Sequence, residues 1–240
     1  MTSVEEHREW RTARDRAVWS RWGIASLAHT HWLGAAPVEL PGLPGRWRVE
    51  DDTVIGEPGP AGVPAMLATG GELECGNLLL RVIERDGAFA LRVFDPAAAA
   101  RRGISAIESF PVSDAWVREG RFVADVDAEP EMVMAVDHHA VRHDFAGTVS
   151  FELGGVELGL RVTRSGVGFS AVFSDATSGG ESYRFRFLRL PAPDSHGRVQ
   201  VDLNRAYLPP CAFSDEYLCV MPSPGNRWAV PIRAGERTVS

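Results

Sequence analysis

Apolar side chains recur at three- and four-residue intervals near the start of the chain. Trp10, Ala13, Ala17 and Val18 follow this spacing, and most positions between them are charged or polar. This period is typical of an amphipathic helix, and glycine favours a helix end, so we predict one helix over residues 4–22, ended by Gly23. A basic amphipathic helix can bind membranes, but the interspersed acidic residues here favour packing on the protein's own core.

The next clear pattern is a pair of β-rich runs around a tight-turn signal. Residues 78–83 and 89–94 are rich in branched and aromatic side chains, and Asp86-Gly87 lies between them. An Asp-Gly dipeptide favours the turn of a β-hairpin, so we predict that the two runs pair. The preceding residues, 33–71, are rich in glycine and proline and contain only short strand-like pieces.

From residue 145 onward, apolar and polar positions alternate clearly. Three alternating runs cover residues 149–173 and are separated by two glycine-containing turns. A period of two predicts a three-stranded meander with one buried face. Two more strands are expected at residues 183–187 and 199–203, whereas residues 104–140 show no clear period. The strand–glycine loop–helix unit that binds dinucleotides does not occur in the sequence.

Together these patterns predict a mainly β protein with an N-terminal helix, a β-sandwich-like N-terminal half and an antiparallel C-terminal β half. The expected organisation is a helix and lead-in over residues 1–32, a small β-sandwich-like subdomain over 33–103, and an antiparallel β subdomain over 104–240 with a Pro-rich C-terminal loop. A chain of 240 residues is long enough to bury cores of this kind.

Charge and composition narrow the classes of function. The formal net charge is −7, whereas nonspecific nucleic-acid binding needs a basic surface, so we expect no nucleic-acid partner. All 25 basic residues are arginine, which excludes a Schiff-base lysine and a phosphate-loop lysine. No run reaches the roughly 18 apolar residues of a membrane span. The charged N-terminus lacks the apolar core of a secretion signal. We therefore expect a cytoplasmic protein with no membrane partner; the oligomeric state is left open.

Histidines and cysteines are the first candidates for metal binding or nucleophilic chemistry. His138, His139 and His143 are close in sequence, but no distant ligand completes the set, so we favour a solvent-exposed loop over a metal site. Cys211 and Cys219 lack the spacing of a zinc ribbon, and three cysteines are too few for a disulfide framework. We favour a buried thiol pair, because no base accompanies Cys211 as a nucleophile. No cofactor is expected.

A dense run of polar side chains near the C-terminus precedes a stiff Pro-Pro pair. The run contains Asp202, Asn204, Arg205 and Tyr207, and the prolines fix the backbone that follows, which predicts an ordered loop. Strand alternation would place Asp202 and Asn204 on one face, and Arg205 and Tyr207 on the other. On this pattern, the four side chains can serve one site only if the chain bends before the prolines.

Two candidate groups have both a structural and a functional interpretation. Arg205 is either half-buried against an acid such as Asp175 or Glu181, or free to bind a ligand carboxylate or phosphate. His29 and His31 would share one face of a strand. We favour the interpretation that they are partly buried histidines whose ring nitrogens have hydrogen-bond partners. The alternative is that one of them is a general base at the rim of a pocket.

The C-terminal third resembles a known family. The resemblance is carried by Phe173–Gly179 with Tyr183, Arg186–Leu188, Val201–Tyr207, Pro209–Phe213, Cys219, Asn226-Arg227 and Ile232–Glu236. This pattern is similar to that of the bacterial and archaeal family called domain of unknown function 1684. His31-Trp32-Leu33 also resembles an element of that family.

The resemblance implies little about activity, because none is assigned to the family. The first half is faintly similar to forkhead-associated β-sandwiches, but the phosphopeptide-reading residues of that fold are not found, so phosphothreonine binding is not implied. Phe185, Leu208 and Trp228 depart from the family pattern. Leu208 makes the polar loop more apolar than the family pattern implies.

We therefore expect a protein that binds a small anionic molecule or peptide in a polar cleft around the Asp202–Cys211 segment. One alternative is a hydrolase-like enzyme that uses the same cluster, with Asp202 or His31 as base. The other is a structural or interaction protein whose polar cluster only stabilises the fold. The candidate ligand-binding residues are His31, Tyr183, Asp202, Asn204, Arg205, Tyr207, Cys211, Asn226 and Arg227.

Overall fold

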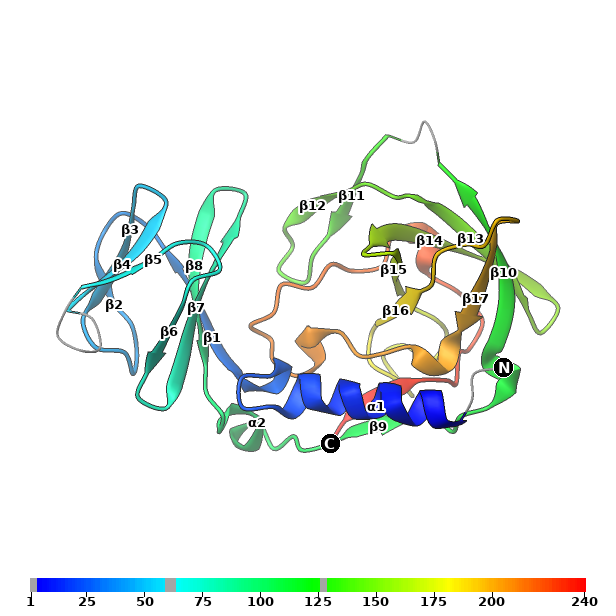
Figure 1. Cartoon of the computed structure of the whole chain (residues 1–240), viewed down its shortest axis with the longest axis horizontal. Coiled ribbons are helices and arrows are strands. Elements are labelled where there is room, and N and C mark those ends of the chain that lie inside the picture. Colours follow the sequence, from blue (N-terminus) through cyan, green and yellow to red (C-terminus); the bar gives the residue numbers. More distant parts are fainter. Residues whose placement is uncertain (1–3, 59–63, 126–128) are drawn as a thin grey trace. The chain divides into compact units, whose positions relative to one another are not determined.

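The computed structural model describes residues 4–58, 64–125 and 129–240 (Figure 1). The chain divides into two compact units, one of residues 14–104 and one of residues 1–13 together with 105–240. A buried hydrophobic cluster lies within each unit. The mainly β fold with an N-terminal helix is confirmed.

Helix α1 runs over Val4–Trp19, about one turn shorter than predicted. Gly23 lies just beyond the helix, and the short 3₁₀ turn η1 (Ile24–Ser26) follows it. A Cβ atom at Gly23 would lie 2.5 Å from the Val18 carbonyl oxygen, so only glycine fits this return of the chain. Val18 is fully buried, while most other helix side chains are exposed or half-buried. Within the described part of the chain, no helix is long and apolar enough to cross a membrane.

The unit of residues 14–104 contains two four-stranded antiparallel sheets. The first has the order β1 (Leu27–Leu33), β8 (Ala88–Phe94), β7 (Leu78–Arg85), β6 (Glu72–Cys75), and the second β2 (Val38–Glu39), β3 (Arg46–Glu50), β4 (Thr53–Glu57), β5 (Ala65–Leu67). Trp47 of one sheet and Leu80 of the other belong to a single buried cluster, which confirms the β-sandwich-like half. A short helix, α2 (Ala98–Arg101), follows β8.

The predicted hairpin of this unit is confirmed. Strands β7 and β8 pair antiparallel in continuous register from Leu79 opposite Phe94 to Arg85 opposite Ala88. Asp86 and Gly87 both have positive φ angles, 51° and 80°, as a two-residue type I′ turn requires.

The other unit is built on a six-stranded antiparallel sheet. Its order is β16 (Arg186–Leu190), β15 (Gly168–Phe173), β14 (Val156–Ser165), β13 (Gly147–Leu153), β10 (Val117–Ala124), β17 (Arg198–Asp202). The sheet curls into a half-barrel, so that the edge strands β16 and β17 approach each other (Figure 1). The predicted meander is confirmed as β13–β14–β15. Its alternate residues, such as Val149, Leu160 and Phe173, form the core with Trp228.

Short elements complete this unit. Strands β11 (Glu131–Met134) and β12 (Ala140–His143) form a hairpin, and β9 (Ile107–Ser109) pairs with β18 (Glu236–Val239). Four 3₁₀ turns occur in the described chain of this unit: η2 (Asp114–Trp116), η3 (Leu203–Arg205), η4 (Pro210–Ala212) and η5 (Pro224–Asn226).

The strand expected over residues 183–187 begins only at Arg186. Tyr183 and Phe185 instead pack in a separate cluster with Cys211 and Cys219. An alternating pattern identifies apolar side chains that are buried, but it does not identify the cluster in which they are buried. Here the alternation begins before strand β16 does.

Candidate functional site

The polar C-terminal run bends at Asp202, where β17 ends and the η3 turn begins. Asp202 caps the turn, because its Oδ1 accepts a hydrogen bond from the Asn204 N–H at 3.1 Å. The turn carries Arg205 back toward Asp202, with Arg205 Nε 3.4 Å from Asp202 Oδ2. The expected alternation was therefore wrong here, because the cap replaces the extended backbone that alternation requires.

The expected acid partners of Arg205 were also wrong. Asp175 instead pairs with Arg186 at 2.7 Å, and neither side chain has any exposed surface. Glu181 pairs with Arg233 at 2.6 Å on the surface. Sequence separation could not decide among these arginines, because the pairing depends on how strands far apart in sequence fold together.

Two buried asparagines, Asn204 of the run and Asn226 of η5, hydrogen-bond like pieces of main chain. The Asn204 side chain accepts a hydrogen bond from Ser113 N–H at 3.1 Å and donates one to Ser113 C=O at 3.0 Å. Asn226 does the same with Arg161, at 2.7 and 2.9 Å, and also donates to Val172 C=O. Each amide thus joins a loop to neighbouring main chain and satisfies buried backbone groups.

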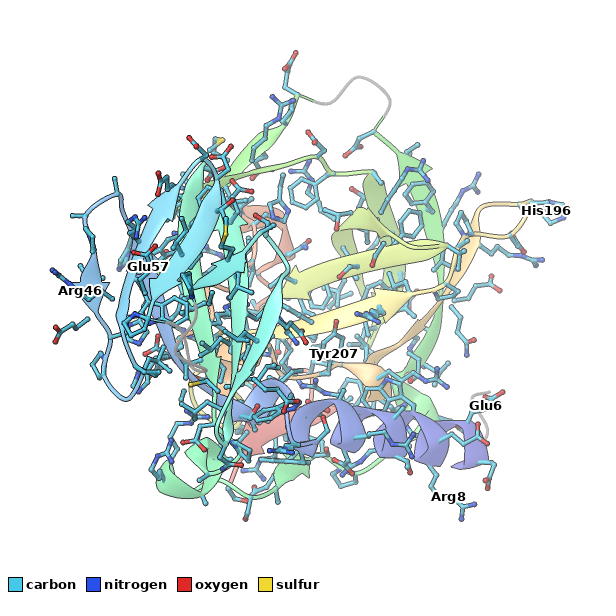
Figure 2. The ribbon with its side chains drawn as sticks, turned by 60° about the vertical axis from the view of Figure 1, so that its left-hand side comes forward. Glu6, Arg8, Arg46, Glu57, His196 and Tyr207 are labelled. Atoms are coloured by element: carbon cyan, nitrogen blue, oxygen red, sulfur yellow. The ribbon has the colours of Figure 1, made fainter. Side chains whose placement is uncertain are left out.

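A cleft opens beside the Asp202–Arg205 turn. Its volume is about 430 Å³, and it is lined by Glu6, Arg189, Leu190, Pro191, Gln200, Asp202 and Arg205. We call it the Asp202–Arg205 cleft. Glu6 comes from the first turns of α1, where Figure 2 labels it. Burial lowers the pKa of the neighbouring His7, and the charges of Arg11 and Arg205 lower it further against the opposing effect of Asp202.

Cys211, directly after the Pro-Pro pair, forms a second cluster with Cys219. Cys211 N–H donates to Cys219 Sγ at 3.3 Å, and the Tyr183 hydroxyl donates to Cys211 C=O at 2.9 Å and lies 3.6 Å from Cys211 Sγ. A hydrogen bond from the Cys219 thiol, helped by Tyr183, lowers the pKa of Cys211 to about 7 although burial opposes the change. The same contact and burial raise the pKa of Cys219. The expected buried thiol pair is confirmed.

Three further candidates lie outside both clusters. The Tyr207 ring packs edge-on against Phe187 at a centroid distance of 5.7 Å. Arg227 is exposed and donates from Nε and one terminal nitrogen to Pro222 C=O. His31 belongs to the unit of residues 14–104, where its ring stacks on His29 from the same face of β1. The candidate residues are therefore distributed over several places rather than gathered into one.

The histidine cluster of residues 138–143 does not come together as a metal site. His138 lies in the turn of the β11–β12 hairpin with φ of 64°, and His143 is the last residue of β12. Over the described ranges 4–58, 64–125 and 129–240, no group of three His, Cys, Asp or Glu side chains is placed to hold a metal ion.

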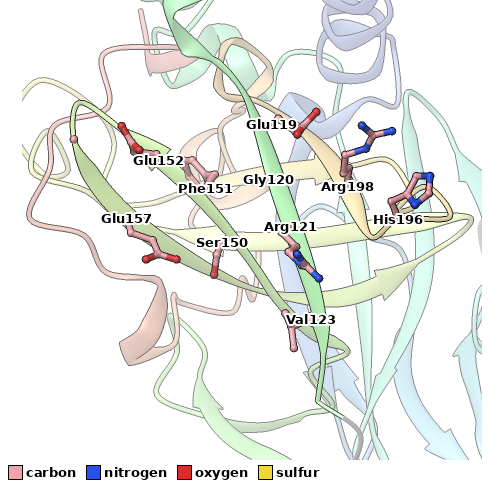
Figure 3. Close-up of a pocket in the computed structure, with 11 residues that line it drawn as sticks. Glu119, Gly120, Arg121, Val123, Ser150, Phe151, Glu152, Glu157, His196 and Arg198 are labelled. Atoms are coloured by element: carbon pink, nitrogen blue, oxygen red, sulfur yellow. The ribbon is translucent and has the colours of Figure 1, made fainter.

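A hollow larger than the cleft lies elsewhere, along strands β10, β13 and β17 (Figure 3). It has a volume of about 790 Å³. Most of its side chains are exposed, and acidic ones such as Glu119 and Glu152 alternate with basic ones such as Arg121 and Arg198. Mixed, solvated charges of this kind are ordinary for a protein surface, so we assign no site there.

Comparison with known proteins identifies the family. A family model described as "Protein of unknown function (DUF1684)" matches residues 103–237, more than half of the chain. The chain belongs to this DUF1684 family. The solution NMR structure of an uncharacterised protein of Haloarcula marismortui is similar, with 30% sequence identity and a TM-score of 0.47, over 57% of this chain and 79% of the other. No curated protein matches the chain.

Arg189, one side chain of the cleft in this DUF1684 protein, was missed by the sequence reasoning. A usable signal was present, because strand β16 buries Arg186, Leu188 and Leu190 and so turns Arg189 outward. Glu6 carried no such signal, since it lies far from the polar run in sequence and outside the matched residues.

Proposed function

We propose that this DUF1684 protein binds a small anionic molecule in the Asp202–Arg205 cleft. The supporting observation is that Arg189 and Arg205 line the same concave surface. Guanidinium groups bind carboxylates and phosphates through paired hydrogen bonds. Neither Arg189 nor the terminal nitrogens of Arg205 donate a hydrogen bond within the part of the chain that the structure describes. These donors are therefore available to a ligand.

The acidic side chains of the cleft limit the charge of that ligand. Asp202 and Glu6 line the same surface and would repel a polyanion. The two arginines and two acids of the cleft cancel in formal charge, so a singly charged molecule such as a small carboxylate suits it better than a polyanion. The volume of about 430 Å³ lies in the range, roughly 300–1,000 Å³, that is usual for small-molecule sites.

The hydrolase alternative has less support. It would use Asp202 or His31 as base, but the cleft lining contains no hydroxyl or thiol nucleophile among the described residues. The structural alternative fits Asn204 and Asn226, because their side-chain amides are hydrogen-bonded to main-chain N–H and C=O groups. It does not account for the two arginines of the cleft.

A thermal-shift titration tests the proposal. The probes are acetate, pyruvate, benzoate and inorganic phosphate at constant ionic strength. A ligand that binds only the folded protein must raise its melting temperature with concentration. We expect this rise for at least one monocarboxylate, and we expect Arg189→Gln and Arg205→Gln to reduce it.

Arg164→Gln is the matched control, because Arg164 is an exposed arginine of strand β14 outside the cleft. It should keep the wild-type response. The proposal is wrong if none of the probes raises the melting temperature, or if the response persists unchanged in both cleft variants.

A further inference from the structure

A second, smaller cavity lies away from the Asp202–Arg205 cleft. Its volume is about 190 Å³, and its lining comes from β11, β12, β14, β15 and β16 and from residues 220–226. Much of the wall is apolar or aromatic, including Val133, Val172, Phe187 and Val220. A cavity of about 150 Å³ with such walls is large enough to bind benzene. The space therefore fits one aromatic ring with a small substituent.

One polar group in the wall lacks a partner. Ser223 is 3% exposed, and its Oγ has no hydrogen-bond partner among the described residues. Buried hydroxyl groups are almost always hydrogen-bonded, and an unpaired one destabilises the fold. Asn226, three residues later, holds the same wall rigidly through its bonds to Arg161 and Val172. The unpaired hydroxyl thus sits in an ordered wall, which points to a ligand with a polar atom.

The charged group of the cavity is already neutralised. Arg161 pairs with Glu131 and lies 3.7 Å from Asp125, and its guanidinium stacks over the Phe145 ring at 4.0 Å. His143 is another titratable side chain of the lining, and burial lowers its pKa, which favours the neutral form. Two carboxylates thus offset the one cationic side chain of the lining, and a charged ligand would lose its hydration without compensation.

We propose that this cavity binds a neutral, single-ring aromatic molecule that carries one hydroxyl group, of the phenol class. The ring occupies the space beside Phe187 and the valines, and the Ser223 side chain, whose Oγ is itself buried, rotates about its Cα–Cβ bond to pair with the hydroxyl group. The binding site is independent of the cleft and does not rest on the anion proposal.

Phenol and toluene are the probes, because the two have nearly the same shape and only phenol carries a hydroxyl group. Each is titrated into the full-length protein and followed by amide chemical shifts in NMR spectra. We expect phenol to bind more tightly, with shifts confined to the cavity wall. Ser223→Ala should weaken phenol about fivefold to tenfold, the effect of one hydrogen bond, and leave toluene unchanged.

Ser223→Ala is expected to fold as well as the wild type, because the hydroxyl group that it removes has no partner to lose. Val172→Phe adds volume to the cavity and should reduce the binding of both probes. Arg205→Gln, in the other cleft, should change neither. The proposal is overturned if phenol binds no better than toluene, if Ser223→Ala leaves phenol affinity unchanged, or if the shifts map outside the cavity.

Discussion

At the residue scale, Arg186 is the largest buried polar side chain that the structure describes in the unit of the curled sheet. Its guanidinium pairs with Asp175 and donates to the carbonyl oxygens of Ile232, Ala234 and Glu236. Asp175 in turn accepts from Thr177 and from Ile232 N–H. This network ties the segment before β18 to strand β16. The buried charge is tolerated because nearly every hydrogen-bond donor and acceptor around it has a partner.

Replacing this arginine should be costly. Arg186→Met leaves the Asp175 carboxylate buried without its cation and leaves three carbonyl groups without their donor. We expect the free energy of unfolding, measured by urea denaturation, to fall by about 3–5 kcal/mol. Arg233→Met is the control, since Arg233 pairs with Glu181 on the surface and should leave stability nearly unchanged. Equal losses in the two variants would contradict the assigned role of Arg186.

The thiol pair predicts a pH dependence of stability. The pKa of Cys211 is lowered from about 9 to about 7 in the folded protein, mainly by the hydrogen bond from Cys219. Between these values the unfolded chain binds more protons, so stability rises from pH 7 to pH 9 and is lost as the pH falls again. Above pH 9 the trend reverses, because the pKa values of Cys219 and Tyr183 are raised by their surroundings.

Denaturation curves from pH 6 to 10 check this dependence. Cys211→Ser removes the low-pKa thiol and should abolish the rise between pH 7 and pH 9. Cys75→Ser is the matched control, because burial raises the pKa of Cys75 and no hydrogen bond lowers it. A rise that persists in Cys211→Ser would show that another group titrates in this range.

The important polar residues of this unit could be predicted from the sequence, but their hydrogen-bond partners could not. Residue types marked Asp202 and Asn204 as parts of an ordered segment, and the family resemblance added Asn226. Their partners lie far away in the chain: Ser113 is 91 residues from Asn204, and Arg161 is 65 residues from Asn226. No spacing rule reports such pairs. The Ser223 hydroxyl carried no signal either, because a serine beside proline is usually part of a turn.

At the element scale, predictions succeeded where the signal was local. The Asp86-Gly87 turn fixes the β7–β8 hairpin, and strict alternation fixes the β13–β15 meander, because both depend on neighbours in sequence. They failed at η3, where the Asp202 side chain caps a turn that competes with the strand. Strand β10 had no clear period, because glycine occupies its buried position at residue 120.

Gly120 explains why β10 fits tightly between β13 and β17 in the curled sheet. A Cβ atom there would lie 2.7 Å from Val149 Cγ1 and 3.1 Å from Val201 Cγ2. Gly120→Ala should therefore overpack the core and lower the free energy of unfolding by about 1–3 kcal/mol in chemical denaturation. Gly159→Ala in strand β14 is the control, because its nearest neighbour is 3.4 Å away. A smaller loss at Gly120 than at Gly159 would contradict this packing argument.

At the scale of the whole molecule, the chain builds two hydrophobic cores from separate sets of residues. Trp47 and Leu80 belong to the core of the sandwich unit, whereas Leu160 and Trp228 belong to that of the curled sheet. The latter unit also includes residues 1–13 at the opposite end of the sequence. Apolar patterns identify each strand, but they carry no information about which distant segments share a core.

Separate cores predict separate unfolding. A unit with its own core can unfold as its own cooperative transition, so calorimetry on the full chain should resolve two transitions. Leu80→Ala removes buried volume from the sandwich core, and Leu160→Ala does so from the curled-sheet core. Each should lower the melting temperature of one transition by roughly 10 °C and leave the other within about 2 °C. A single transition that both substitutions lower alike would mean that the two cores unfold together.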